Sequence, residues 1–209
     1  MFGMPSGEPY DFLSEGDSPT FFLLFDWGFR TLEDFSYGGI AGRYHLVPGE
    51  VNSKGEALNL WDVSRDEYTD RDGQVHVTES MWPYVADIQR DFAARVAWAA
   101  ADTFEKGEHA PKLEIREGVD LSAKPGEKIT LHADAVSPDN LPVHVSFRVY
   151  QDASPEWAKG VAAVTGETYA EFTLPADAVP GEKFHIIVKA QAEGHHRLVH
   201  YRQVIVTVK

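Results

Sequence analysis

The sequence has no cysteine among its 209 residues, which excludes disulfide bonds, thiolate nucleophiles and zinc–thiolate sites. It has no apolar run near the ~20 residues of a membrane-spanning helix. Residues 1–10 show neither the basic nor the apolar region of a signal peptide. Nucleotide-binding glycine loops and a Gly-x-Ser-x-Gly elbow are also lacking, so nucleotide-loop and serine-hydrolase chemistry have no support.

Basic residues are scarce: 19 Lys and Arg stand against 33 Asp and Glu, which gives a net charge of −14. Such a chain repels phosphate backbones, so we expect no nucleic-acid partner. Residues 1–108 carry 20 acidic and 8 basic side chains, against 13 and 11 in residues 109–209. This asymmetry predicts two units with different surfaces, and the 43% hydrophobic content is sufficient for packed cores.

The first half contains one clear helical pattern, over residues 82–104. Val85, Ile88, Phe92 and Val96 recur at three- and four-residue spacing, which predicts one buried stripe packed on residues 21–25. Asp87 and Asp91 are expected near the polar face of this helix. Two further segments have no such period: residues 35–44 predict an irregular, tightly packed glycine loop, and residues 48–76 predict a long surface loop.

The second half changes to a period of two after Pro111, and Gly107 with Pro111 marks the boundary. Short strands separated by two Pro-Gly-Glu-Lys turns predict a two-sheet antiparallel sandwich of immunoglobulin-like size. The expected strands cover residues 112–116, 128–135, 144–150, 169–174, 183–191 and 199–208. The expected core residues are Ile129, Leu131, Val145, Phe147, Phe172, Ile186, Val188, Val204 and Val206.

Several segments, in order along most of the chain, resemble a bacterial family in which a nucleoside-hydrolase-like domain precedes an immunoglobulin-like module. Some members of this family are cellulose-binding or carbohydrate-associated. The matching segments are Glu15-Gly16-Asp17-Ser18-Pro19, Gly38-Gly39-Ile40-Ala41-Gly42-Arg43-Tyr44, Asp91-Phe92-Ala93-Ala94-Arg95 with Trp98, Phe184-His185-Ile186-Ile187-Val188 and Tyr201-Arg202-Gln203-Val204-Ile205-Val206-Thr207-Val208.

The resemblance implies an α+β chain: residues 1–108 correspond to the end of a nucleoside-hydrolase-like α/β domain, and residues 109–209 form the immunoglobulin-like antiparallel β-sandwich. It places Glu15, Asp17, Trp27 and Arg43 on the substrate-binding side, with Asp17 as a metal ligand. The expected partners are the upstream nucleoside-hydrolase-like domain or a second copy, and carbohydrate. The implied location is extracellular or periplasmic.

The sequence departs from the family at its metal site. Nucleoside hydrolases hold calcium with an N-terminal Asp-rich cluster, and residues 1–30 contain none. No cofactor is evident in this chain, and calcium is expected only together with an upstream domain, because the ion takes six to eight oxygen ligands. Asp17 or Ser18 equally fits the cap of a helix that begins near Pro19.

Other candidate sites have ordinary structural explanations. Asp66, Glu67, Asp70 and Asp72 are read as a solvated acidic loop, since an EF-hand glutamate is missing at the required offset. His195, His196 and His200 are expected on the surface, because His196 and His200 stand ~13 Å apart along a strand. Eight aromatic residues could stack on sugars if they are exposed, but core packing is the more common role of such residues. They are Trp27, Phe29, Phe35, Tyr37, Tyr44, Trp61, Trp82 and Tyr84.

Three functions remain open from the sequence. The first is a non-catalytic C-terminal region of a nucleoside-hydrolase-like, carbohydrate-associated protein, with the second half as an accessory module that packs on the catalytic domain or binds a polysaccharide. The second is part of an N-glycosidic hydrolase that an upstream domain completes. The third is an independent adhesion or interaction module. The missing Asp-rich cluster favours the first over the second, and an uncovered apolar face on residues 1–108 would favour the first over the third.

Overall fold

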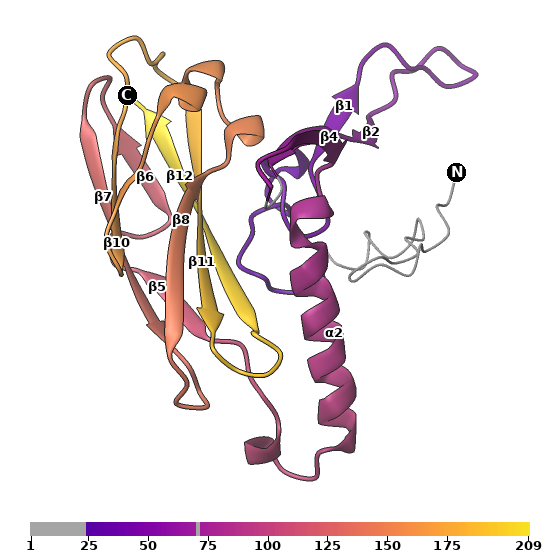
Figure 1. The fold of residues 1–209 in the computed structure, drawn as a ribbon. Helices are drawn as coiled ribbons and strands as arrows, with labels where there is room; N and C mark the ends of the chain where they lie inside the picture. The colour runs from indigo at the N-terminus through magenta and orange to yellow at the C-terminus, as the bar shows by residue number, and fades with distance from the viewer. Residues whose placement is uncertain (1–23, 70–71) are drawn as a thin grey trace. The chain divides into compact units, whose positions relative to one another are not determined.

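The computed structural model describes residues 24–69 and 72–209 of the chain (Figure 1). They fall into two compact units, Met1–Val85 and Ala86–Lys209. The residues predicted to bind substrate at positions 15 and 17, and the first half of the apolar run 20–27, lie outside the described residues. In the described part, no helix has the length and apolarity needed to cross a membrane.

The second unit contains two four-stranded sheets. One has the order β5-β7-β10-β9, and the other has the order β6-β12-β11-β8. The strands are β5 (Lys112–Ile115), β6 (Asp120–Ala123), β7 (Lys128–Val136), β8 (Val143–Val149), β9 (Val164–Thr165), β10 (Tyr169–Thr173), β11 (Lys183–Ala192) and β12 (Val199–Val208). All neighbours pair antiparallel except β6 and β12, which are parallel, so the expectation of a wholly antiparallel sandwich is wrong at this one edge.

One apolar core joins the two sheets. Leu131 and Phe172 from the first sheet cluster with Phe184, Ile186 and Val204 from the second, and all five side chains are fully buried. The remaining predicted core residues belong to this cluster or pack against it. Alternating side chains point to opposite sides of a strand, so the period of two in β7 places Ile129, Leu131, Ala133 and Ala135 in or against this core. The β-sandwich prediction is therefore confirmed.

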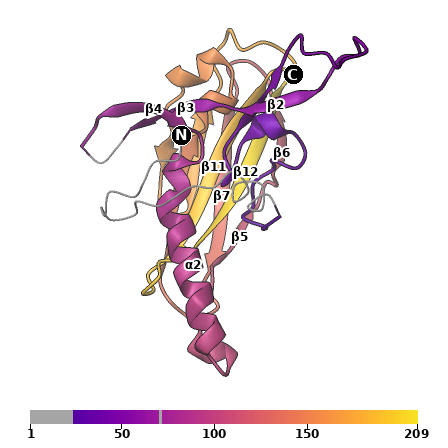
Figure 2. The ribbon, with the colours of Figure 1, turned by 90° about the vertical axis from the view of Figure 1, so that its right-hand side faces the viewer.

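The helix α2 (Val85–Ala100) follows a single 3₁₀ turn, η2 (Trp82–Tyr84), and ends four residues earlier than the pattern predicted. Figure 2 shows α2 crossing in front of β11 and β12. Val85 and Ile88 are buried as expected, but Phe92 and Val96 are 65% and 57% exposed. The single buried stripe is therefore wrong: the side of α2 that faces the sandwich carries Asp87 and Ala94 instead.

The described part of the first unit, residues 24–69 and 72–85, has little regular structure. The strands β1 (Tyr44–Val47) and β2 (Leu60–Val63) form one ribbon, and β3 (Arg65–Thr69) and β4 (Val75–Glu79) form another. The expected surface loop 48–76 thus contains β2, β3 and the start of β4, although its described side chains are largely exposed. The short 3₁₀ helix η1 (Phe35–Tyr37) opens the glycine segment, which is tightly packed as predicted: a Cβ on Gly42 would lie 2.9 Å from Ser80 Oγ.

Another 3₁₀ turn, η3 (Phe104–Lys106), follows α2 and leads into the linker to β5. Two more 3₁₀ turns, η4 (Gln151–Ala153) and η5 (Glu156–Gly160), connect β8 to β9.

Candidate functional site

The first unit contains both described residues that the sequence predicts to bind substrate. Trp27 is 8% exposed and lines a hollow of about 200 Å³ with Phe29, Thr31 and Ile40. Within the described residues, its indole Nε1 has no hydrogen-bond partner. Arg43 donates from Nε (3.0 Å) and Nη2 (2.7 Å) to Oδ1 of the buried Asp66, so its guanidinium holds β3. The structure brings Trp27 beside a hollow and Arg43 into an ion pair.

The acidic and histidine clusters have structural explanations. Asp66 is buried against Arg43 and is not part of a solvated loop. His195 and His196 are held by their backbone, since both of their N–H groups donate to the carboxylate of Glu108. Among the described residues, no group of three or more acidic, histidine or cysteine side chains is arranged to hold a metal ion.

Three aromatic rings gather where α2 ends and the linker to the sandwich begins. The Phe104 and His109 ring centroids are 3.6 Å apart with their planes at 15°, and those of His109 and Trp98 are 5.8 Å apart at 17°. The rings border a hollow of about 430 Å³, the linker hollow, which is lined by Trp98, Ala101, Asp102, Thr103, Phe104, Gly107 and His109. It falls within the range of about 300–1,000 Å³ that is typical of small-molecule sites.

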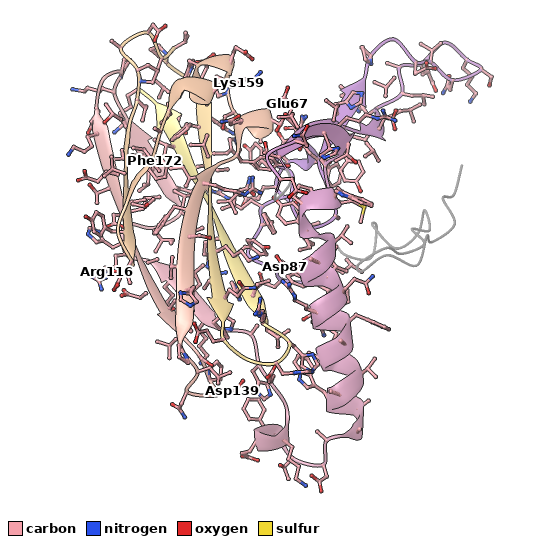
Figure 3. The ribbon with its side chains drawn as sticks, in the orientation of Figure 1. Glu67, Asp87, Arg116, Asp139, Lys159 and Phe172 are labelled. Atoms are coloured by element: carbon pink, nitrogen blue, oxygen red, sulfur yellow. The ribbon has the colours of Figure 1, made fainter. Side chains whose placement is uncertain are left out.

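Hydrogen bonds fasten this linker to the sandwich at two points. Asp139, in the β7–β8 loop, accepts from the backbone N–H of His109 (2.7 Å) and contacts its Nδ1 (2.8 Å) (Figure 3). Glu108 accepts from the β11–β12 turn through His195 and His196. The indole of Trp98 donates to Glu108 O at 2.7 Å and lies against Gly107, where a Cβ would be 2.9 Å from Trp98 Cδ1. The rings therefore stand on a fixed support.

The parallel rings are not the ones that the sequence singled out. Among the eight expected aromatics, Phe35 and Trp61 lie 5.4 Å apart but nearly perpendicular, at 87°, which offers no common plane. The rings of the linker hollow come from positions 98, 104 and 109, on both sides of a helix end, and no periodic pattern relates them. The available signal was Gly107 between Phe104 and His109, because a glycine there allows a ring to approach the backbone.

The opposite face of the sandwich carries charged pairs. Arg116 binds Asp134 with two hydrogen bonds (2.7 and 2.6 Å), which hold the pKa of Asp134 below its ordinary value and raise the pKa of Arg116 (Figure 3). Burial raises the pKa of Glu117, but hydrogen bonds from the backbone and ring of His132 outweigh it and leave that pKa lowered. These charges neutralise one another, so the face offers few unengaged charged groups to a ligand.

The comparisons with known proteins support the resemblance drawn from the sequence. Residues 128–208, from β7 to β12, match the family model described as the C-terminal domain of cellulose-binding protein Sde0182. A solved structure of a nucleoside hydrolase-related hypothetical protein from Saccharophagus degradans, associated with carbohydrate metabolism, matches with a TM-score of 0.72 and 24% identity. It covers 95% of this chain and 48% of that one, so the chain spans about half the length of that protein.

Two structures of titin domains also match, with lower TM-scores. The titin domains Z1Z2 in complex with telethonin give a TM-score of 0.31 with 18% identity and cover 49% of each chain. The titin M3 domain gives 0.30 with 10% identity and covers 46% of this chain and 96% of that one. Scores this low do not establish a shared fold. A comparison with curated proteins gives no match.

Proposed function

We propose that this chain is the non-catalytic C-terminal region of a carbohydrate-associated, nucleoside-hydrolase-like protein. In this proposal residues 109–209 are an immunoglobulin-like accessory module that binds polysaccharide, and residues 1–108 are the last segment of the nucleoside-hydrolase-like domain. The observation that carries it is the match of residues 128–208 to the C-terminal domain of a cellulose-binding protein. The resemblance adds an extracellular or periplasmic location, where polysaccharides are found.

The outward side of α2 supports an upstream domain as partner. Phe92, Ala93, Val96, Ala97 and Ala100 are all exposed, while Asp87 on another side of the helix contacts the sandwich. A helix that is apolar on its outward side is normally covered, and apolar patches of this kind mark interfaces. The similar solved structure contains about as much chain again, which provides a partner of the required kind.

An alternative is that the region completes an N-glycosidic hydrolase once the upstream domain is present. The similarity to a nucleoside hydrolase-related protein over 95% of this chain favours it. Trp27, Arg43, Glu15 and Asp17 would then contribute to a substrate site shared with that domain. The accessory function requires polysaccharide binding by this chain alone, and the hydrolase function does not.

Sedimentation with insoluble polysaccharide tests the proposal. We expect the purified 209-residue chain to pellet with microcrystalline cellulose in a saturable way, and soluble cello-oligosaccharides to release it. An unrelated acidic protein such as serum albumin controls for nonspecific adsorption, and insoluble xylan and chitin define the sugar preference. If the chain stays in the supernatant with all three polysaccharides, the accessory function is wrong and the hydrolase alternative gains.

A further inference from the structure

We propose that the linker hollow is a sugar-binding subsite in which the Phe104 ring stacks on one pyranose unit of a β-linked glucan. This inference rests on the proposed polysaccharide binding and assigns a place to it. The hollow belongs entirely to the second unit, and its lining residues run from Trp98 to His109.

The rings provide the required geometry. A pyranose presents a flat apolar face of C–H groups, and aromatic rings bind such a face by stacking. Phe104 is 63% exposed although it is a large apolar side chain, and its plane is within 15° of the His109 ring behind it. The Phe104–His109 pair therefore forms a flat platform with an accessible outer ring.

The rim of the hollow supplies groups for hydroxyls. Asp102 and Thr103 line it beside Phe104, and a carboxylate and a hydroxyl are suitable partners for sugar O–H groups. Asp102 also pairs with Lys106 at 2.6 Å, but both side chains are well exposed, so this pair costs little to rearrange. An apolar platform with a few polar groups at its edge is the usual composition of a sugar site.

The platform is held in place before any ligand arrives. An ionised carboxylate can only accept hydrogen bonds, so the contact between Asp139 and His109 Nδ1 requires a proton on Nδ1. This hydrogen bond fixes the orientation of the imidazole ring. Glu108, the residue before His109, accepts a hydrogen bond from the backbone N–H of His196 in the β11–β12 turn. Rings that are already ordered lose little conformational entropy when a ligand binds.

The other surfaces of the second unit fit a sugar less well. The hollow of about 450 Å³ at the end of the sandwich is lined by His144, Gln191, Ala192, Glu193, Gly194 and Arg197, and no phenyl or indole ring is among them. On the charged sheet face, Tyr169 is 40% exposed, but its ring lies over Gly166 and beside His132. Tyr169 therefore serves as a matched control: an exposed ring outside the linker hollow.

Calorimetric titration of the full chain with cellopentaose tests the subsite. Phe104→Ala is expected to raise the Kd about three- to tenfold, the effect of losing one aromatic contact. Phe104→Tyr keeps the ring and is expected to preserve the affinity, and Tyr169→Ala is expected to leave it unchanged. Because Phe104 and Tyr169 are exposed, both alanine variants should keep the far-ultraviolet circular dichroism of the original chain.

The possible outcomes separate the two proposals. If the original chain binds cellopentaose but Phe104→Ala binds equally well, the subsite is wrong and polysaccharide binding stands. If Tyr169→Ala alone weakens binding, the charged sheet face is the site and the linker hollow is not. If the original chain binds neither cellopentaose nor any of the three insoluble polysaccharides, both the subsite and the accessory function are overturned.

Discussion

At the scale of single residues, Asp87 is a charged side chain that connects two elements of the second unit. Its side chain is buried, and it accepts hydrogen bonds from Lys189 Nζ (2.7 Å), Arg90 Nη1 (3.2 Å) and the hydroxyl of Tyr201 (Figure 3). Lys189 and Tyr201 belong to β11 and β12, so this one carboxylate ties α2 to the sandwich. The sequence predicted that Asp87 lies on the polar face of the helix. It did not predict that this face packs on the sandwich, because the helical pattern contains no information about polar groups on the partner surface.

Replacing Asp87 with alanine should therefore destabilise the chain by about 3–5 kcal/mol, since it leaves the Lys189 ammonium without its buried counter-charge. Asp91→Ala is the matched control on the same helix. It removes an (i, i+4) pair with Arg95, in which the Arg95 side chain is 45% exposed and the Asp91 side chain 15% exposed, and should cost about 0.3–0.5 kcal/mol. Urea unfolding followed by tryptophan fluorescence measures both. Equal losses would show that Asp87 does not anchor the helix.

At the scale of elements, the strands of the sandwich were predictable and the faces of α2 were not. A strand with one buried side shows a period of two, and the expected strand 199–208 matches β12 at both ends. The strand β9 has two residues, too few to show a period, and it was missed together with the four-residue strand β6. In α2, apolar residues occupy more than one side, so the pattern could not say which side the sandwich covers.

The linker hollow shows the same limit for the candidate site. Its three rings meet because α2 ends and the chain turns back through η3, and this path depends on the anchors Asp139 and Glu108. Asp139, in the β7–β8 loop, is 30 residues away from its partner His109 in the sequence. Glu108 is 87 residues away from His195 in the β11–β12 turn. Local patterns contain no information about such contacts.

Two phenylalanines allow a comparison of stability between the buried core and the outward side of α2. Phe172 is fully buried between the sheets, whereas Phe92 is 65% exposed. Phe172→Ala should cost about 3–5 kcal/mol, the range for a large cavity in a packed core. Phe92→Ala should cost about 0.5 kcal/mol or less in the dilute, monomeric chain, as for a surface substitution. Chemical unfolding of both variants gives the comparison, and a large loss for Phe92→Ala would mean that this side of α2 is covered in solution.

At the scale of the whole molecule, the chain joins a well-packed sandwich to a unit with little regular structure. The described first unit has two small hairpins and exposes large apolar side chains such as Leu24, Trp61 and Trp82. The chain also spans about half of the similar solved protein. Both facts are in line with the proposal that an upstream domain packs on this chain, while the sandwich carries its own core.

The isolated chain should therefore self-associate through the outward side of α2, because the face that an upstream domain would cover is left in contact with water. Sedimentation velocity over a range of concentrations should show a weight-average mass that rises towards the dimer. Phe92→Asp places a charge at the centre of this face and should return the chain to a monomer. Val164→Asp is the matched control, since Val164 is exposed to the same degree on β9. Dimerisation that persists in Phe92→Asp, or that Val164→Asp abolishes, would place the contact elsewhere and remove the main structural support for docking through α2.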